Sequence, residues 1–349
     1  MKKEFKCVIW DLDDTLWDGT LMESDRVVLK ESVREILEEL DSRGILLSIA
    51  SRNNYEDAMH KLQEFGIDHF FLYPEINWNA KSSTVGKIQK KLNIGMDTIL
   101  FIDDQEFERD EVQSAHPEIT CMDAGEYLKL LDDSRLQPQF ITEDSKRRRL
   151  MYLEESQRKK DEEAFDGPSD AFLATLNMKF IISEAREEDL KRAEELTVRT
   201  NQLNATGRTY DYEELDAFRQ SDNYRLLVCE LVDKYGSYGK IGLALIEKTR
   251  THWHLRLLLM SCRVMSRGVG TVFLSYIMQE AKGKSKKLLA DFKRTDRNRM
   301  MYVTYRFANF QEVSADETGQ ILFENDLSRI QPFPPHIEVC TPQKQVHGG

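Results

Sequence analysis

Three aspartates in four positions follow a short apolar run near the N-terminus, in the segment CVIWDLDDTLWDG. The run 5–10 is rich in β-branched and aromatic residues, which predicts a buried strand. Asp11, Asp13 and Asp14 repel one another at the end of this strand, and burial disfavours their charged forms further. The cluster is therefore stable if it is a solvated strand end before a helix cap, or if a cation such as Mg2+ neutralises it.

The pattern of the next segments alternates between buried strands and amphipathic helices as far as about residue 132. Further strands are expected at 45–51, 69–74 and 98–104. Helices are expected at 28–44, 54–66, 81–95 and 107–116. This alternation predicts a parallel sheet with helices on both faces. In such sheets the functional site lies at the carboxyl ends of the strands.

Other predicted element ends carry side chains that suit phosphate chemistry. Ser51 follows the second strand, where its hydroxyl is placed to bind a phosphoryl oxygen. Lys81 begins the third helix, so its charge is directed to the same edge of the sheet. Asp103 and Asp104 end the fourth strand, beside the first acidic cluster. A single lysine after a loop is usually a surface residue, but these motifs in this order predict a phosphoryl-transfer site.

The order DxDxT, Ser, Lys and an acidic pair resembles the signature of the haloacid dehalogenase superfamily. The resemblance implies that Asp11 is the nucleophile that attacks phosphorus and that Asp13 is the general acid/base. It implies that Mg2+ is held by Asp11, Asp13 and Asp103. It also implies a set of phosphate- or substrate-binding residues: Thr15, Ser51, Asn53, Lys81 and Asp104. The short connections leave no room for a large cap domain, so we expect a site that is open to a bulky substrate or a protein.

The composition of the chain changes after these motifs. We assign 1–135 to a first domain, 136–176 to a charged helical connector, 177–331 to a second domain and 332–349 to a flexible tail. Strands of the second domain are expected at 178–185, 224–232, 239–248, 253–262 and 287–292. Helices are expected at 268–282 and 297–307. The first four strands have the pattern of an antiparallel meander.

Motifs from both domains resemble the FkbH-like proteins, subfamily IIIC of the same superfamily: CVIWDLDDTLWDG, IASRNN, FIDDQEFERDEV, RTNQLNATGR and SCRVMSRGVG. The resemblance covers nearly the whole chain. It implies a fold class, an α/β chain with a capless, doubly wound parallel sheet and then a GNAT-like α/β acyltransferase domain. It also implies an activity, in which a glyceryl unit is taken from 1,3-bisphosphoglycerate, phosphate is removed, and an acyl carrier protein is loaded as a thioester. Such thioesters supply polyketide-type biosynthesis.

A glycine-rich turn in the second domain suits the pyrophosphate and pantetheine of a thiol carrier. Arg267, Gly268 and Gly270 directly precede an apolar helix, whose N-terminal N–H groups favour an anion. With Arg263, these are the carrier-binding residues that the resemblance implies. YRFANF resembles the YxxxGF element of GNAT folds with Asn309 in place of glycine. Asparagine is the next best residue for a left-handed turn, so the shape is expected to persist.

Cys262 ends the strand on which GNAT folds place the acyl group, and Arg263 and Arg267 favour its thiolate. A small, buried, apolar cysteine is an alternative role for this residue. The rival thiol, Cys7, lies four residues before Asp11 within a strand and is expected to be buried and inert. We therefore favour Cys262 as a catalytic thiol.

His254 shares a strand face with Cys262 and is the candidate base, although eight residues along a strand is too far for contact without a bend. An ordinary half-exposed histidine is the alternative. The segment RTNQLNATGR places Asn201, Asn204 and Arg208 in an element that is expected to contact substrate or pantetheine.

Composition excludes several classes. The formal charge of −12 argues against a general nucleic-acid binder, and no apolar stretch is long enough to span a bilayer. Basic runs at 146–149 and 282–287 are typical of solvated surface, or of a docking patch for an acidic carrier protein. Five scattered cysteines and the lack of a signal-peptide pattern indicate a cytoplasmic protein.

Two alternatives to glyceryl transfer remain open. The first is an Mg2+-dependent small-molecule phosphatase whose second domain is structural. The second is a non-catalytic carrier-binding protein. This hypothesis has less support, because the phosphoryl-transfer motifs are intact.

Overall fold

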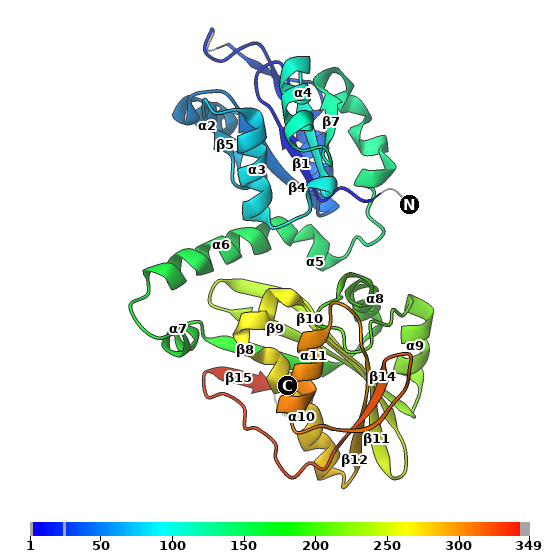
Figure 1. The fold of residues 1–349 in the computed structure, drawn as a ribbon. Helices are drawn as coiled ribbons and strands as arrows, with labels where there is room; N and C mark the ends of the chain where they lie inside the picture. The colour runs from blue at the N-terminus through cyan, green and yellow to red at the C-terminus, as the bar shows by residue number, and fades with distance from the viewer. Residues whose placement is uncertain (1–2, 24–25, 343–349) are drawn as a thin grey trace. The chain divides into compact units, whose positions relative to one another are not determined.

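The computed structural model describes residues 3–23 and 26–342, and the chain divides into two units at Ser156 (Figure 1). We name the part up to Ser156 unit 1 and the part from Gln157 unit 2. The division falls within a helix, α6 (Arg148–Ala164), inside the segment that we predicted as a connector. The two halves of this helix therefore belong to different units.

Unit 1 is built on a parallel sheet with the strand order β5-β4-β1-β6-β7 (Figure 1). Its strands are β1 (Cys7–Trp10), β4 (Leu46–Ser51), β5 (Glu75–Ile76), β6 (Ile99–Asp103) and β7 (Thr120–Asp123). A short pair beside the sheet consists of β2 (Trp17–Asp18) and β3 (Val28–Leu29). Trp10 lies beside Ile49 and Ile102, so the ends of the three central strands meet at one edge of the sheet.

Helices bury the apolar side chains of both faces of this sheet. One face packs against α1 (Val33–Ser42) and α2 (Tyr55–Glu64), and the other against α3 (Lys81–Leu92) and α4 (Glu106–Ala115). Shorter helical segments are η1 (Asp68–Phe70), η2 (Met96–Thr98), η3 (Ala124–Asp132), η4 (Ser134–Leu136) and α5 (Glu143–Lys146). The parallel sheet with helices on both faces is the arrangement that we predicted.

The third strand differs from its prediction. We expected it at 69–74, but η1 covers part of this range and the strand is β5, at Glu75–Ile76. Tyr73 has a φ of 50°, a left-handed conformation that a strand does not accommodate. Phe71 still forms an isolated parallel bridge with Leu47 of β4, so the predicted pairing is present at this residue, and the strand β5 begins after the turn at Tyr73.

Unit 2 contains an eight-stranded sheet in the order β13-β14-β12-β11-β10-β9-β8-β15 (Figure 1). Its strands are β8 (Met178–Glu184), β9 (Tyr224–Asp233), β10 (Gly236–Lys248), β11 (His252–Met260), β12 (Lys287–Lys293), β13 (Gln311–Ala315), β14 (Gln320–Asn325) and β15 (Ile337–Cys340). The helical elements are α7 (Ser169–Thr175), η5 (Glu187–Asp189), α8 (Leu190–Arg199), α9 (Tyr212–Gln220), η6 (Cys262–Arg267), α10 (Val269–Gly283) and α11 (Arg299–Phe307). Strands β8 to β11 form the predicted antiparallel meander, and β12 runs parallel to β11.

The strands β11 and β12 pair only at their beginnings, over His252–Leu255 and Lys287–Ala290. Beyond this point the segment 203–205 lies between them. The N–H of Ala205 donates to the carbonyl of Leu258 at 3.0 Å, and the N–H of Lys293 donates to the carbonyl of Ala205 at 3.0 Å. The strands β11 and β12 therefore separate toward their C-terminal ends, and the segment 203–205 fills the space between them.

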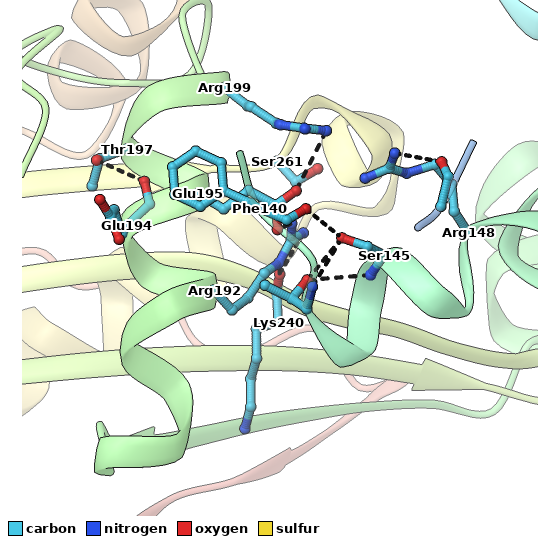
Figure 2. A network of polar contacts seen from close by, with 12 residues as sticks. Phe140, Ser145, Arg148, Arg192, Glu194, Glu195, Thr197, Arg199, Lys240 and Ser261 are labelled. Atoms are coloured by element: carbon cyan, nitrogen blue, oxygen red, sulfur yellow. Dashed lines mark hydrogen bonds and ion pairs between the residues drawn. The ribbon is translucent and has the colours of Figure 1, made fainter. Parts of the chain in front are cut away.

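A buried carboxylate fixes α8 against this sheet. Glu195 is fully buried, and it accepts a 2.7 Å hydrogen bond from Arg192 and lies 3.4 Å from Arg199 (Figure 2). Arg192 also donates to the carbonyl of Lys240 in β10 at 3.1 Å. These contacts stabilise a charge that would be costly to bury alone.

The predicted flexible tail is wrong in its first part. Residues Ile337–Cys340 form β15, which pairs in parallel with β8. Its side chains alternate: Ile337 and Val339 are buried, and the residues that follow each of them are exposed or half-exposed. Burial of the two apolar side chains stabilises the strand. The rest of the predicted tail, at 343–349, lies outside the described residues. No helix in the described part of the chain is long and apolar enough to cross a bilayer.

Candidate active site

Lys81 joins the ends of two neighbouring strands of unit 1. Its Nζ lies 2.7 Å from Oδ1 of Asp11, which follows β1, and 2.5 Å from Oδ2 of Asp103, which ends β6. All three residues are buried. Burial alone would lower the pKa of Lys81, but the charges of Asp11 and then Asp103 outweigh it and raise that pKa. The structure therefore brings together three of the predicted site residues around one charged lysine.

A second set of contacts involves two residues that the sequence analysis missed. Glu108 is buried on α4, and its Oε2 lies 3.5 Å from Nζ of Lys81. Its Oε1 lies 3.0 Å from Nη1 of Arg52, which follows β4. Glu108 lies in the first turn of α4, shortly after the acidic pair that ends the fourth predicted strand, and this position was the available signal that it is close to the same site.

Three carboxylates of the described residues are grouped closely enough to hold one metal ion. Asp11, Asp103 and Asp104 each offer an oxygen, and these oxygens lie within 4.8 Å of one another. One oxygen of Asp104, Oδ1, is buried without a hydrogen bond to any described residue. Burial, reinforced by the charge of Asp11, raises the pKa of Asp103 to about 7. Oxygen ligands in this arrangement suit a divalent cation such as Mg2+.

The metal-ligand prediction therefore differs in one residue. We expected Asp13 with Asp11 and Asp103, but Asp104 takes that place in the group. The Asp13 carboxylate accepts hydrogen bonds from Nε1 of Trp17 at 2.8 Å and from Nδ2 of Asn53 at 3.0 Å.

The environment of Asp13 suits proton exchange. Burial raises the pKa of this carboxyl, although the hydrogen bonds from the Leu21 N–H and from Trp17 oppose the rise. A carboxyl group with a raised pKa holds its proton more readily and can deliver it to a leaving oxygen. Asn53, which we predicted as a substrate-binding residue, donates a hydrogen bond to Asp13 and so orients the carboxylate.

The remaining predicted residues of this site have different roles. Thr15 accepts a 3.1 Å hydrogen bond from the N–H of Asp104, so it joins the loop after β1 to the loop after β6. Ser51 is buried at the end of β4, and no hydrogen bond of the described residues uses its hydroxyl. The Ser51 hydroxyl is therefore available for a phosphoryl oxygen.

In unit 2, the glycine-rich turn borders a cavity of about 130 Å³. The cavity is mainly apolar, and its walls come from the end of β11, the turn, α11 and one residue of the inserted segment 203–205. Its lining residues are Leu203, Leu258, Met260, Val264, Met265, Gly268, Gly270, Thr271, Met300, Met301 and Thr304. Gly268 has a φ of 73° as it begins α10, and Asn309 has the predicted left-handed φ of 70°.

The two predicted carrier-binding arginines have partners inside unit 2. Arg267 is buried, and its Nη1 lies 3.7 Å from Oε2 of Glu162. Arg263 donates to the carbonyl of Tyr238 at 3.1 Å. Neither arginine lines the cavity beside the glycine-rich turn.

Cys262 is exposed at the start of η6, so the alternative of a buried structural cysteine does not hold. No hydrogen bond or ion pair of the described residues joins its thiol to Arg263, Arg267 or His254. Cys7 is buried as expected, and burial raises the pKa of its thiol well above the ordinary value. This makes Cys7 a poor nucleophile.

His254 is directed toward β12. Its Nε2 lies 2.8 Å from Oδ1 of Asp291, and Nη1 of Arg256 lies 3.1 Å from Oδ2 of the same carboxylate. Burial would raise the pKa of Asp291, but the hydrogen bond and charge of His254 and then those of Arg256 outweigh it and lower that pKa. The structure therefore pairs His254 with Asp291 and not with Cys262.

The segment RTNQLNATGR is organised by one buried amide. Asn204 accepts hydrogen bonds from the N–H groups of Thr206 at 3.2 Å and Gly207 at 2.9 Å. Its side chain is therefore committed to the loop, which differs from the substrate contact that we predicted. Asn201 and Arg208 are exposed, and the Arg208 guanidinium lies 5.0 Å from the ring centre of Tyr210.

Comparisons with known proteins agree with the geometry of unit 1. Residues 19–118 match the family model of the haloacid dehalogenase-like hydrolases. Unit 1 is therefore similar to haloacid dehalogenase-like hydrolases over these residues. The human protein magnesium-dependent phosphatase 1 is 29% identical over 136 residues, which cover 34% of this chain and 76% of the relative.

Two solved structures are also similar. One is the N-terminal part of a Bacteroides fragilis protein, which contains a phosphatase domain and is complexed with Mg. It is 30% identical with a TM-score of 0.32, over 37% of this chain, and this chain spans 40% of its length. The other is an N-acetyltransferase from Staphylococcus aureus, 17% identical with a TM-score of 0.33, over 43% of this chain and 99% of that one.

The predicted fold class is confirmed. Unit 1 has the predicted parallel sheet with helices on both faces, and unit 2 is a mixed α/β domain that contains the predicted antiparallel meander.

Proposed function

We propose that the chain is an Mg2+-dependent phosphatase whose unit 1 removes phosphate during the transfer of a glyceryl unit. The observation that carries the phosphatase function is the contact of Lys81 with Asp11, beside the carboxylate group formed with Asp103 and Asp104. A buried carboxylate that keeps its charge beside a cation is a suitable nucleophile for phosphorus. The lysine also compensates the negative charge that develops on the transferred group.

The residues of unit 1 divide the reaction between them. A carboxylate oxygen of Asp11 attacks the phosphorus of the ester phosphate, and the bond from phosphorus to the leaving alcohol oxygen breaks. Asp13 gives its proton to that oxygen and later takes a proton from the water that hydrolyses the aspartyl phosphate. The accepting thiol displaces the other phosphate from the acyl carbon, so the thioester forms as the acyl phosphate bond breaks. The Ser51 hydroxyl and the Lys81 ammonium bind phosphoryl oxygens. Asp11, Asp103 and Asp104 would hold Mg2+, which supplies charge neutralisation between nucleophile and phosphate.

The glyceryl-transfer part of the proposal is supported by unit 2. Its cavity of about 130 Å³ is mainly apolar, and Gly268 and Gly270 of the glycine-rich turn line it. This shape suits a pantetheine arm, which is a slender chain with few charges. The resemblance to FkbH-like proteins adds the donor, 1,3-bisphosphoglycerate, and the acceptor, an acyl carrier protein.

One observation favours a second candidate function. Among the described residues, no hydrogen bond joins the exposed Cys262 to a base, and His254, eight residues before it in the sequence, is paired with Asp291. A thiol without a base is a slower nucleophile. This favours the alternative of a small-molecule phosphatase whose unit 2 is structural.

Intact mass spectrometry of the carrier separates the two functions. A phosphopantetheinylated acyl carrier protein is incubated with the enzyme, Mg2+ and 1,3-bisphosphoglycerate, and phosphate release is measured in parallel. A glyceryl mass gain on the carrier that requires the enzyme supports glyceryl transfer. Full phosphate release without a mass gain favours the plain phosphatase.

A further inference from the structure

Glu108 is shared by two cations in unit 1. Its Oε2 lies 3.5 Å from Nζ of Lys81, and its Oε1 lies 3.0 Å from Nη1 of Arg52. The residue is only 4% exposed, and its Oε2 has no hydrogen bond to any described residue. Burying a charged carboxylate costs free energy unless cations compensate it. The burial of Glu108 therefore depends on its contacts with Lys81 and Arg52. Glu108 therefore links Lys81, whose charge also serves Asp11 and Asp103, to Arg52, whose one ion pair among the described residues is with Glu108 itself.

Arg52 is held at the carboxyl edge of the sheet but reaches solvent. It lies between Ser51 and Asn53 in the loop after β4, and both neighbours belong to the phosphoryl-transfer site. Its Nε donates to the carbonyl of Asn79 at 3.4 Å, while 40% of its side chain is exposed. No hydrogen bond of the described residues uses its Nη2. A guanidinium in this state can still bind a carboxylate or phosphate.

The two cations differ in what they are free to bind. Lys81 contacts Asp11 and Asp103, so its charge is used at the reacting centre. Arg52 contacts neither of these carboxylates; its ion pair with Glu108 is the one found for it among the described residues. Arg52 is therefore the cation beside this site whose charge is not used by Asp11 or Asp103, and its guanidinium can bind an anionic group.

We propose that Arg52, positioned by Glu108, binds a second anionic group of the substrate, a carboxylate or a second phosphate, beside the phosphate that is transferred. This inference rests on the proposed phosphatase function of unit 1. It makes the substrate class a small phosphate ester with a second negative charge. Glu108 is a positioning residue, because it contacts both cations and not the reacting atoms.

The test compares three-carbon phosphate esters that carry different second groups, and it follows how each preference changes between the wild type and the variants. The probes are 3-phosphoglycerate, which carries a carboxylate, propane-1,3-diol bisphosphate, which carries a second phosphate, and glycerol 3-phosphate, which carries neither. We expect the wild type to prefer the doubly anionic probes in kcat/KM. Arg52→Gln should lower this preference about tenfold or more, mainly through KM, because it removes a charge-assisted hydrogen bond. If Arg52→Gln loses the preference for 3-phosphoglycerate, the bound group is a carboxylate. If it loses the preference for propane-1,3-diol bisphosphate, the bound group is a phosphate.

Two further variants control the experiment. Arg52→Lys keeps the charge but not the planar fork, so it should retain part of the preference. Lys129→Gln removes one positive charge from an exposed pair with Glu126 in the same unit and should leave the preference unchanged. An equal loss for all three probes in Arg52→Gln would show a structural role and overturn the proposal, as would an unchanged preference.

A binding measurement separates this inference from the phosphatase function itself. Calorimetry with Mg2+ compares 3-phosphoglycerate, propane-1,3-diol bisphosphate and glycerol 3-phosphate in an Asp11→Asn background, with and without Arg52→Gln. A weaker preference for either doubly anionic probe in the double variant supports the role of Arg52, even if no probe is hydrolysed by the wild type. Lack of hydrolysis in the wild type would count against the phosphatase function alone. An identical preference in both backgrounds overturns the inference.

Discussion

The Nζ of Lys81 lies 2.7 Å from Oδ1 of Asp11, so the proposed nucleophile is ion-paired inside a site that also contains Asp103 and Glu108. The pair is buried, and a charged pair in such a site has a large effect when either partner is removed. The role of each partner can therefore be tested separately, one through chemistry and the other through stability.

Asp11→Asn should abolish phosphate release, with a loss of at least about 10³-fold, because a neutral amide cannot attack phosphorus. The fold should persist, since the amide has nearly the same shape. Phosphate release from a phosphate monoester is measured with Mg2+ present. Asp18→Asn makes the same chemical change at an exposed position paired with Lys30 and should keep activity. Near wild-type release by Asp11→Asn would remove the assignment of the nucleophile.

Lys81→Met should destabilise the protein by about 3–5 kcal/mol in the absence of divalent cations, because Asp11 and Asp103 lose their buried cation. Mg2+ should then raise the stability of the variant more than that of the wild type, since the metal would bind to carboxylates that otherwise repel. Urea unfolding with EDTA and with Mg2+ measures both effects. An equal response to Mg2+ would contradict the proposed metal site.

Much of unit 1 could be predicted because its pattern is local. Buried strands, helices and a cap such as Asn54, which accepts hydrogen bonds from two N–H groups of α2, are visible in the sequence. The third strand was misplaced because Tyr73 adopts a left-handed conformation that no composition rule indicates. In unit 2, β13 was missed because all of its residues are exposed and show no alternation.

In the candidate sites, too, the sequence predicted the contacts that follow from local pattern and missed those that depend on tertiary packing. Asp11, Lys81 and Asp103 converge because the ends of parallel strands meet at one edge, which a sequence pattern can predict. The pairing of His254 with Asp291 depends on β11 lying beside β12 with a particular register. Sheet order of this kind follows from tertiary packing and not from local pattern, so the sequence led us to pair His254 with Cys262.

Asp291→Asn should lower stability by about 1–3 kcal/mol at pH 7, because Asp291 accepts hydrogen bonds from His254 and Arg256. Its pKa is held below the ordinary value, so its contribution is present above about pH 3.9 and is lost as the pH falls through the folded-state pKa. The difference from wild type should therefore shrink between about pH 5 and pH 3. Urea unfolding across this range checks it, with the exposed Asp222→Asn as control. A difference that stays constant to pH 3 would contradict the depressed pKa.

The last prediction concerns the division of labour between the units. If glyceryl transfer passes through a thioester on the enzyme, Cys262→Ala should abolish transfer to the carrier, because Cys262 is the exposed thiol beside the glycine-rich turn. Release of the ester phosphate should persist in this variant, since Asp11 lies in unit 1, whereas the phosphate that the thiol displaces from the acyl group should no longer be released. Cys7→Ala should leave transfer largely intact, because the Cys7 thiol is fully buried and its pKa is raised.

Trapping the enzyme with 1,3-bisphosphoglycerate but without carrier, followed by peptide mapping, distinguishes the two thiols. A glyceryl adduct on the Cys262 peptide is the expected result, since that thiol is accessible to the acyl phosphate. An adduct on the Cys7 peptide would overturn the choice of Cys262. If neither peptide is modified while the carrier still gains a glyceryl mass, the acyl group passes directly from donor to carrier thiol, which agrees with the absence of a hydrogen bond between His254 and Cys262 among the described residues.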